Sequence, residues 1–195
     1  MIRHARRGDT TEFVIGESGK LYLAAILDLF SRFIVGWAVS AVNDRHLTIK
    51  ALEMAVKRRG PAAGLLHHSD QGCTYASEDY QTILDARGIT CSMSRRGNCY
   101  DNAVMEAFFS SLKSELADRF ESHGDAKMAL FDYIEGIEVF YNERRRHSTI
   151  GYVSPAAFER QAAGRRASAP SGDAVVYGGI LQPDPPNDRH PWGIL

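Results

Sequence analysis

The chain has 195 residues, of which 44% are hydrophobic and 24% are charged, and its formal net charge is −1. This composition excludes collagen-like, disulfide-rich and wholly disordered proteins, and the length suits one domain with an appendage. The three cysteines form no CxxC pair and predict free thiols in a reducing compartment. The longest apolar run, residues 21–27, is far shorter than the ~20 residues of a membrane helix. No secretory signal and no membrane partner are expected.

The first part of the chain predicts a three-stranded meander followed by a helix. Three segments are rich in aliphatic, β-branched or aromatic side chains, namely residues 10–15, 21–28 and 33–40. The links between them are short, which favours antiparallel pairs. A helix is expected over residues 46–59, because its apolar residues follow the 3.6 period and Asn43 or Asp44 can cap it.

The remaining elements alternate between strands and helices. Strands are expected over residues 65–69 and 89–93, and helices over residues 77–87, 102–120 and 125–144. This order predicts an α/β fold with a mixed five-stranded sheet, in which three antiparallel strands are followed by two parallel ones. Beyond Gly164 prolines and glycines accumulate without helical periodicity, so a poorly ordered tail is predicted over residues 161–195.

Two acidic residues stand at positions that suit chemistry. Asp70 follows a short apolar strand, where α/β sheets bind ligands, although Asp-x-Gly is also typical of a turn. Glu106 falls on a helix flank beside the core arc of Phe108 and Leu112, and Lys113 shares that flank; solvated charges are the alternative interpretation. The basic, glycine-containing loop before this helix fits a phosphate backbone near a carboxylate-bound metal. Oxygen ligands without His or Cys clusters favour Mg²⁺ or Mn²⁺.

Four motifs follow one another along the chain. They are Asp9-Thr-Thr with the strand and turn behind it, His68-Ser-Asp-Gln-Gly, the segment 94–115 around Asp-Asn-Ala and Glu106, and the segment 141–155. Together they resemble the integrase catalytic core of bacterial insertion-sequence transposases, relatives of retroviral integrases. The resemblance covers residues 9–160 and implies an RNase H-like fold with helices on both faces of the sheet.

The resemblance also implies a catalytic Asp-Asp-Glu triad, which falls on Asp9, Asp70 and Glu106. These carboxylates are expected to hold two Mg²⁺ or Mn²⁺ ions and to catalyse DNA 3′-end cleavage and strand transfer, the chemistry of DNA integration and transposition. Asp28 and Asp101 are interpreted as turn or capping residues instead.

Cations near these motifs predict the surface that contacts DNA. The residues expected there are Arg95, Arg96, Lys113, Arg145 and His147. His68 and Asn102 are expected to orient ligands or DNA, with a structural role as the alternative, and the 141–155 segment is expected to clasp the core as well. The implied partners are double-stranded DNA and either further copies of the chain or a full-length transposase. The expected location is a bacterial cytoplasm, associated with the nucleoid.

Residues 1–8 depart from the family pattern. Arg3, Arg6 and Arg7 stand where an apolar strand is expected, and the upstream helix-turn-helix region of such transposases is not expected in this chain. Burying unpaired cations is costly, so this segment is expected to stay outside the sheet or fray and to leave Asp9 loosely held. The alternative to an active core is therefore a truncated, non-catalytic remnant that binds DNA or full-length transposase.

Overall fold

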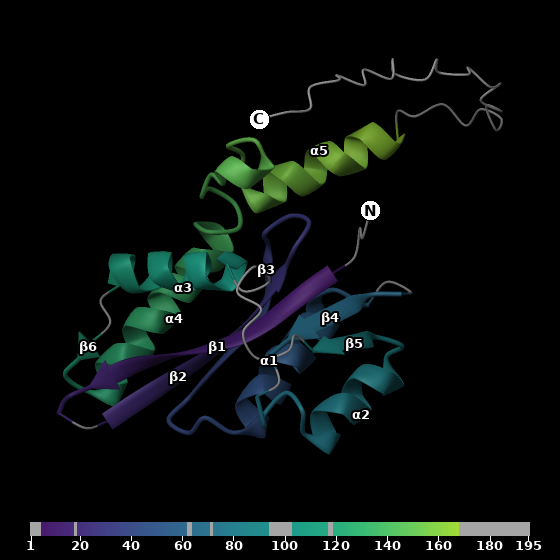
Figure 1. The fold of residues 1–195 in the computed structure, drawn as a ribbon. Coiled ribbons are helices and arrows are strands. Elements are labelled where there is room, and N and C mark those ends of the chain that lie inside the picture. The colour runs from purple at the N-terminus through teal and green to yellow at the C-terminus, as the bar shows by residue number, and fades with distance from the viewer. Residues whose placement is uncertain are drawn as a thin grey trace, which may run out of the picture.

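A mixed sheet lies between two layers of helices (Figure 1). The computed structural model describes residues 5–17, 19–61, 64–70, 72–93, 103–116 and 119–167. Across the sheet the strands are β3 (Ile34–Ser40), β2 (Gly19–Asp28), β1 (Ala5–Ile15), β4 (Leu66–Ser69) and β5 (Thr90–Met93). The two-residue β6 (Arg119–Phe120) pairs with the far end of β1. The predicted five strands are confirmed, and β6 is an addition to them.

The first three strands form the predicted antiparallel meander, whereas β4 and β5 run parallel to β1. Asp28 makes the turn between β2 and β3, since its Oδ1 accepts hydrogen bonds from the backbone N–H groups of Phe30 at 2.9 Å and Ser31 at 3.0 Å. An aspartate engaged with its own turn in this way is a structural residue. The interpretation of Asp28 as a turn residue is therefore confirmed.

One face of the sheet is covered by α1 (Arg45–Arg58) and α2 (Glu78–Ala86). Asp44 caps α1, and its side chain accepts a hydrogen bond from the N–H of Leu47 at 3.2 Å. The helix lies very close to β3, because a Cβ at Gly36 would stand 2.3 Å from the carbonyl oxygen of Ala51. Glycine at this position lets the helix backbone pack directly on the strand.

The opposite face is covered by α3 (Ala103–Leu116) and α4 (His123–Val139). Met105, Phe108 and Leu112 of α3 are buried against this face, which confirms the predicted core arc. The helix predicted over residues 102–120 is too long, however. Residues 119–120 adopt an extended conformation and pair with β1. The helix predicted over residues 125–144 is also too long at its end, because α4 ends at Val139 and residues 140–144 form turns.

A further helix, α5 (Pro155–Ala167), was not predicted. A bidentate ion pair between Arg59 and Glu159, at 2.6 and 2.9 Å, fixes it to the end of α1. Phe158 adds a ring contact to Phe30, with centroids 5.0 Å apart. The expectation of a poorly ordered tail from residue 161 is wrong for residues 161–167, which are helical, and residues 168–195 lie outside the described residues. No helix in the described ranges is both long and apolar enough to cross a bilayer.

The expectation that residues 1–8 stay outside the sheet is also wrong from Ala5 onward. The strand β1 begins at Ala5. In the register of the sheet, the backbone of Arg6 lies opposite Asp28 of β2 on one side and opposite His67 of β4 on the other. Arg6 and Arg7 are only 7% and 2% exposed. Pairing on both sides satisfies the backbone of this segment. The charges of Asp28 and Glu159 favour the charged form of Arg6, and Arg7 lies near Asp9, so the cations that the sequence argument counted as unpaired have acidic groups nearby. Residues 1–4 lie outside the described part.

Candidate active site

Asp9 and Asp70 lie level with each other on neighbouring strands. In the parallel β1–β4 pair Arg7 stands opposite His68, and each aspartate follows two residues later on its own chain. Strands are ~4.8 Å apart and side chains alternate between faces, so both aspartates project from the same face. Phe13 shares this face of β1 and is buried in the cluster that contains α3. The two carboxylates therefore face α3.

Glu106 completes the group from the first turn of α3. Burial raises the pKa of Asp9 above its ordinary value, and the negative charges of Asp70 and Glu106 raise it further. A hydrogen bond of 2.7 Å from the N–H of Thr10 to Asp9 Oδ1 acts in the opposite direction. The fold thus brings the three predicted acidic residues within electrostatic range of one another.

The loop after β4 holds the Asp70 carboxylate in place. The N–H of Gly72 donates to Asp70 Oδ1 at 2.9 Å, and a Cβ at Gly72 would lie 2.8 Å from the same oxygen. Any side chain at this position would push the carboxylate away. Glycine is therefore part of what positions Asp70.

The donor chemistry of this group fits a hard divalent cation. The charges of Asp70 and Glu106 raise the pKa of Asp9, and a cation among the three carboxylates would relieve that repulsion. As they stand, no three His, Cys, Asp or Glu side chains within the described residues are close enough together to hold a metal ion. The fold thus brings the three carboxylates near one another without placing all of them at metal-ligand distances.

Behind Asp9 lies a buried polar group that the sequence did not single out. The hydroxyls of Thr10 and Tyr75 are 3.3 Å apart, and the hydroxyl of Tyr80 is 2.8 Å from His67 Nε2. Burial, followed by the charges of Arg6, His68 and Arg7, lowers the pKa of His67 to about 3. His67 is therefore neutral and packs under β1. The alternation of buried and half-buried residues in β4 could have indicated this, while the predicted supporting residue His68 takes a half-buried position.

Arg7 is the second feature that the sequence did not place. It lies two residues before Asp9 on the same face of β1, and its charge lowers the pKa of Asp9. Its Nε and Nη1 atoms are buried without a hydrogen bond to any described residue. A cation thus stands inside the fold next to the carboxylates.

Among the described residues, the predicted DNA contacts lie in two places: Lys113 is separate, whereas Arg145 and His147 line one pocket. The ammonium of Lys113 lies over the ring of Phe13, 5.6 Å from its centroid. Lys113 is in the last turn of α3, whereas Glu106 is in the first. Arg145 forms an ion pair with Glu115, which also accepts a hydrogen bond from the Tyr133 hydroxyl. His147 packs edge-on against Tyr141, with ring centroids 4.8 Å apart. The predicted residues Arg95, Arg96 and Asn102, together with Asp101, lie outside the described residues.

The 141–155 segment clasps the core through Asn142. Its side chain accepts from the N–H of Ile34 at 2.9 Å and donates to the carbonyl of Ile34 at 3.3 Å. Its own carbonyl accepts from the N–H of Ala156 at the start of α5. The buried amide thus joins the edge strand β3 to α5, in agreement with the predicted clasp.

Comparisons with known proteins point to one family. Two family models, both described as Integrase core domain, match residues 4–99 and 87–155. The chain is 45% identical over 151 residues to the 31 kDa protein of insertion element IS600 from Shigella sonnei, covering 76% of this chain and 54% of that protein. It is 43% identical over 155 residues to the transposase for IS904 from Lactococcus lactis, covering 78% and 60%. The chain spans a little over half the length of these curated relatives.

Solved structures share the fold at low sequence identity. The HTLV-2 integrase catalytic core domain in complex with magnesium, in its trimeric form, matches with a TM-score of 0.60 and 17% identity, over 81% of this chain and 97% of that one. The BIV integrase catalytic core matches with a TM-score of 0.57 and 18% identity, over 85% and 99%. These matches establish the RNase H-like fold that the motifs predicted. Two family models that together span residues 4–155 show that the chain belongs to the integrase core domain family.

Proposed function

We propose that this chain is the catalytic core of an insertion-sequence transposase, which cleaves DNA at 3′ ends and transfers the freed strand. The observation that carries the proposal is the placement of Asp9 on β1, level with Asp70 after β4 and within electrostatic range of Glu106 on α3. Three carboxylates brought near one another between a sheet face and a helix serve hard-metal chemistry better than packing. The family of the chain and its transposase relatives agree with this function.

In this proposal Asp9, Asp70 and Glu106 hold two Mg²⁺ or Mn²⁺ ions. When bound, such ions lower the pKa of an attacking water or 3′-hydroxyl and stabilise the leaving oxygen of the phosphate. The N–H groups of Thr10 and Gly72 orient the two aspartates through their Oδ1 atoms. Lys113, Arg145 and His147, with Arg95 and Arg96, would contact DNA phosphates, and His68 and Asn102 would support the site.

Nicking of supercoiled plasmid DNA tests the proposal. The unmodified chain is expected to nick in Mg²⁺ or Mn²⁺ and to stop in EDTA, while Asp9→Asn, Asp70→Asn and Glu106→Gln lower the rate by at least a hundredfold. Gly72→Ala is expected to lower it as well, because the added methyl displaces Asp70. Asp85→Asn, on the exposed surface of α2, is the matched control and should nick normally. Full activity of Asp70→Asn or Glu106→Gln would contradict the assignment.

Arg7 favours the second candidate, a non-catalytic remnant that binds DNA or a full-length transposase. A buried cation beside Asp9 partly takes the place of a metal ion and lowers the gain from binding one. If this is the state of the chain, it binds plasmid DNA without nicking it, and Arg7→Val then gives Mg²⁺-dependent nicking that Asp9→Asn abolishes. If the chain nicks without that change, the active core is the correct function.

The partners and the location of the whole protein belong to the same proposal. Its relatives are roughly twice as long as the matched segment, and one solved neighbour is an intasome from simian T-cell lymphotropic virus. The HTLV-2 core is known in trimeric and dimeric forms. We therefore expect this chain to act on double-stranded DNA as a homo-oligomer or together with a full-length transposase, on the nucleoid of a bacterial cytoplasm.

A further inference from the structure

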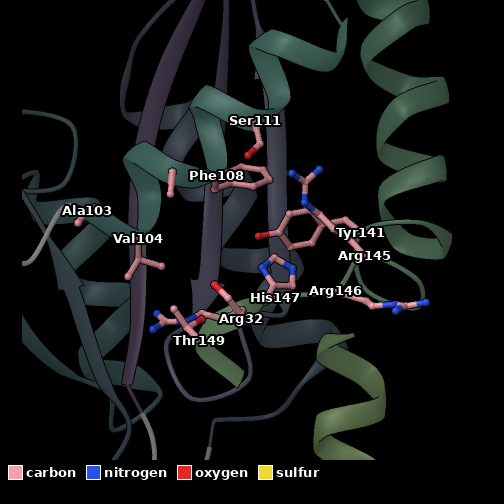
Figure 2. Close-up of a pocket in the computed structure, with 12 residues that line it drawn as sticks. Arg32, Ala103, Val104, Phe108, Ser111, Tyr141, Arg145, Arg146, His147 and Thr149 are labelled. Carbon is pink, nitrogen blue, oxygen red and sulfur yellow. The ribbon is translucent and has the colours of Figure 1, made fainter. Parts of the chain in front are cut away.

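A pocket of about 350 Å³ opens on the flank of α3 that points away from Glu106. Figure 2 shows Tyr141 and His147 in its middle, with Arg145 and Arg32 on two sides and Arg146 pointing outward. None of the twelve residues that the structure places around it is acidic. Its surroundings are therefore cationic, and they favour an anionic occupant.

Arg32 is a cation of this pocket whose side chain has no direct partner among the described residues. The charge of Arg145 is already paired with Glu115. Arg32 is half-buried, and the charge of Asp28 acts on its guanidinium from a distance, but within the described residues that guanidinium makes no ion pair and no hydrogen bond. Burial lowers the pKa of Arg32, although arginine remains charged at neutral pH. An anion in the pocket would give this guanidinium the partner that it lacks.

His147 offers a second polar atom to the same occupant. Its Nε2 is buried and has no hydrogen-bond partner among the described residues. Burial and the charges of Arg145 and Arg32 lower the pKa of His147 to about 4, so the ring is neutral at pH 7 and can donate from one nitrogen. A buried donor without a partner costs free energy, and a ligand oxygen would satisfy it.

The backbone at Arg32 points to selection for the side chain. Arg32 has a φ of 65°, in the left-handed region that favours glycine. A glycine would make this turn with less strain, so a long cationic side chain there is explained by what it binds. The strain and the missing partner are independent observations on one residue.

We propose that this pocket binds a phosphate group of the DNA backbone, with Arg32 and His147 Nε2 as the groups that contact it. This inference rests on the proposed function to the extent that DNA is the ligand. Tyr152 supports a nucleic acid rather than a free anion: it is 72% exposed, has a φ of 58°, and its N–H donates to the carbonyl of His147. An exposed ring on the loop that forms the pocket provides a stacking surface for an unpaired base at the end of a duplex.

The test measures binding without catalysis. The His147 ring signals are followed by NMR in EDTA while inorganic phosphate or a short DNA duplex is added. Both ligands are expected to shift these signals, with the DNA binding at least tenfold more tightly. Arg32→Gly and Arg32→Gln are expected to lose roughly tenfold or more in affinity for both ligands. Tyr152→Ala should weaken DNA binding alone.

Stability and a matched control separate binding from folding. Arg32→Gly relieves the left-handed strain and should keep or slightly raise the melting temperature, so its lost affinity cannot come from unfolding. Arg87→Gln removes the same charge from the exposed end of α2 and should bind as the unmodified chain does. Unchanged affinity in Arg32→Gln, or a response to free phosphate without one to DNA, would overturn the proposal. If the unmodified chain binds phosphate and DNA in this pocket but does not nick plasmid DNA, the proposed function is overturned and the pocket is not.

Discussion

The imidazole of His67 links the stability of this chain to pH. The ring is 1% exposed and shares a hydrogen bond with the Tyr80 hydroxyl. Burial lowers its pKa from the ordinary 6.5 to about 3. Between pH 6.5 and about pH 3 His67 is protonated in the unfolded chain but stays neutral in the folded chain. The free energy of unfolding therefore falls by about 1.4 kcal/mol for each pH unit below 6.5 on account of this residue.

Replacing His67 with Gln should flatten this pH dependence. Glutamine keeps a polar group near Nε2 but does not titrate, so the loss of stability between pH 7 and pH 4.5 should shrink by about 2.5 kcal/mol. Urea unfolding at the two pH values measures the difference. His46→Gln, at an exposed position, controls for general effects of removing a histidine. An unchanged pH dependence in His67→Gln would mean that the ring is already protonated in the fold.

At the residue scale, local chemistry and the apolar core of α3 were predictable, and the burial of charged side chains was not. The turn role of Asp28 follows from its place between two strands, and the structure confirms it. Arg7 and Arg32 escaped prediction because their environment comes from strands and helices distant in the sequence. The assignment of Asp9, Asp70 and Glu106 came from motif resemblance, and their roles remain a prediction.

At the scale of the elements, the buried side chain of Asn142 connects the 141–155 segment to strand β3. Asn142→Ala leaves the N–H and the carbonyl of Ile34 without their partners at the edge of the sheet. Each buried polar group left unsatisfied costs about 1–3 kcal/mol, so a loss of about 3 kcal/mol in the free energy of unfolding is expected. Chemical denaturation measures it.

Ser154→Ala is a suitable comparison for that measurement. It removes only a weak capping bond of 3.3 Å from the N–H of Ala157 at the start of α5, and should cost well under half as much. Equal losses in the two variants would mean that the clasp acts through α5 rather than through the edge strand.

Elements with a clear period were predicted to within a residue or two, including α1, α2 and β2. Those with a weak pattern were not. The short β6 has only two residues and exists because it pairs with β1, while α5 lacks an amphipathic face and depends on Arg59 for its position. Tertiary contacts decide such segments, and these contacts are absent from a local pattern.

For the molecule as a whole, metal binding should raise the melting temperature. An ion that binds only the folded chain stabilises it by about 2.7 kcal/mol at a hundredfold excess over Kd. Mg²⁺ should therefore raise the melting temperature of the unmodified chain, and Asp70→Asn should remove most of this gain. In EDTA the same variant should melt higher than the unmodified chain, since one repelling charge near Asp9 has gone. Thermal scans with and without Mg²⁺ measure both effects, and an equal Mg²⁺ response in both proteins would exclude Asp70 as a ligand.

The central place of β1 has a consequence for synthesis on the ribosome. β1 can form a hairpin with β2 as soon as residues 19–28 emerge, but its other edge waits for β4, which lies on the far side of α1 in the chain. During that interval the open edge of the nascent hairpin is available to other nascent chains. Arg6 and Arg7 occupy that edge, where β4 later pairs, and charged residues on an open strand edge oppose pairing with a foreign strand. We therefore expect the two arginines, costly once buried, to oppose aggregation of the nascent hairpin until β4 has been synthesised.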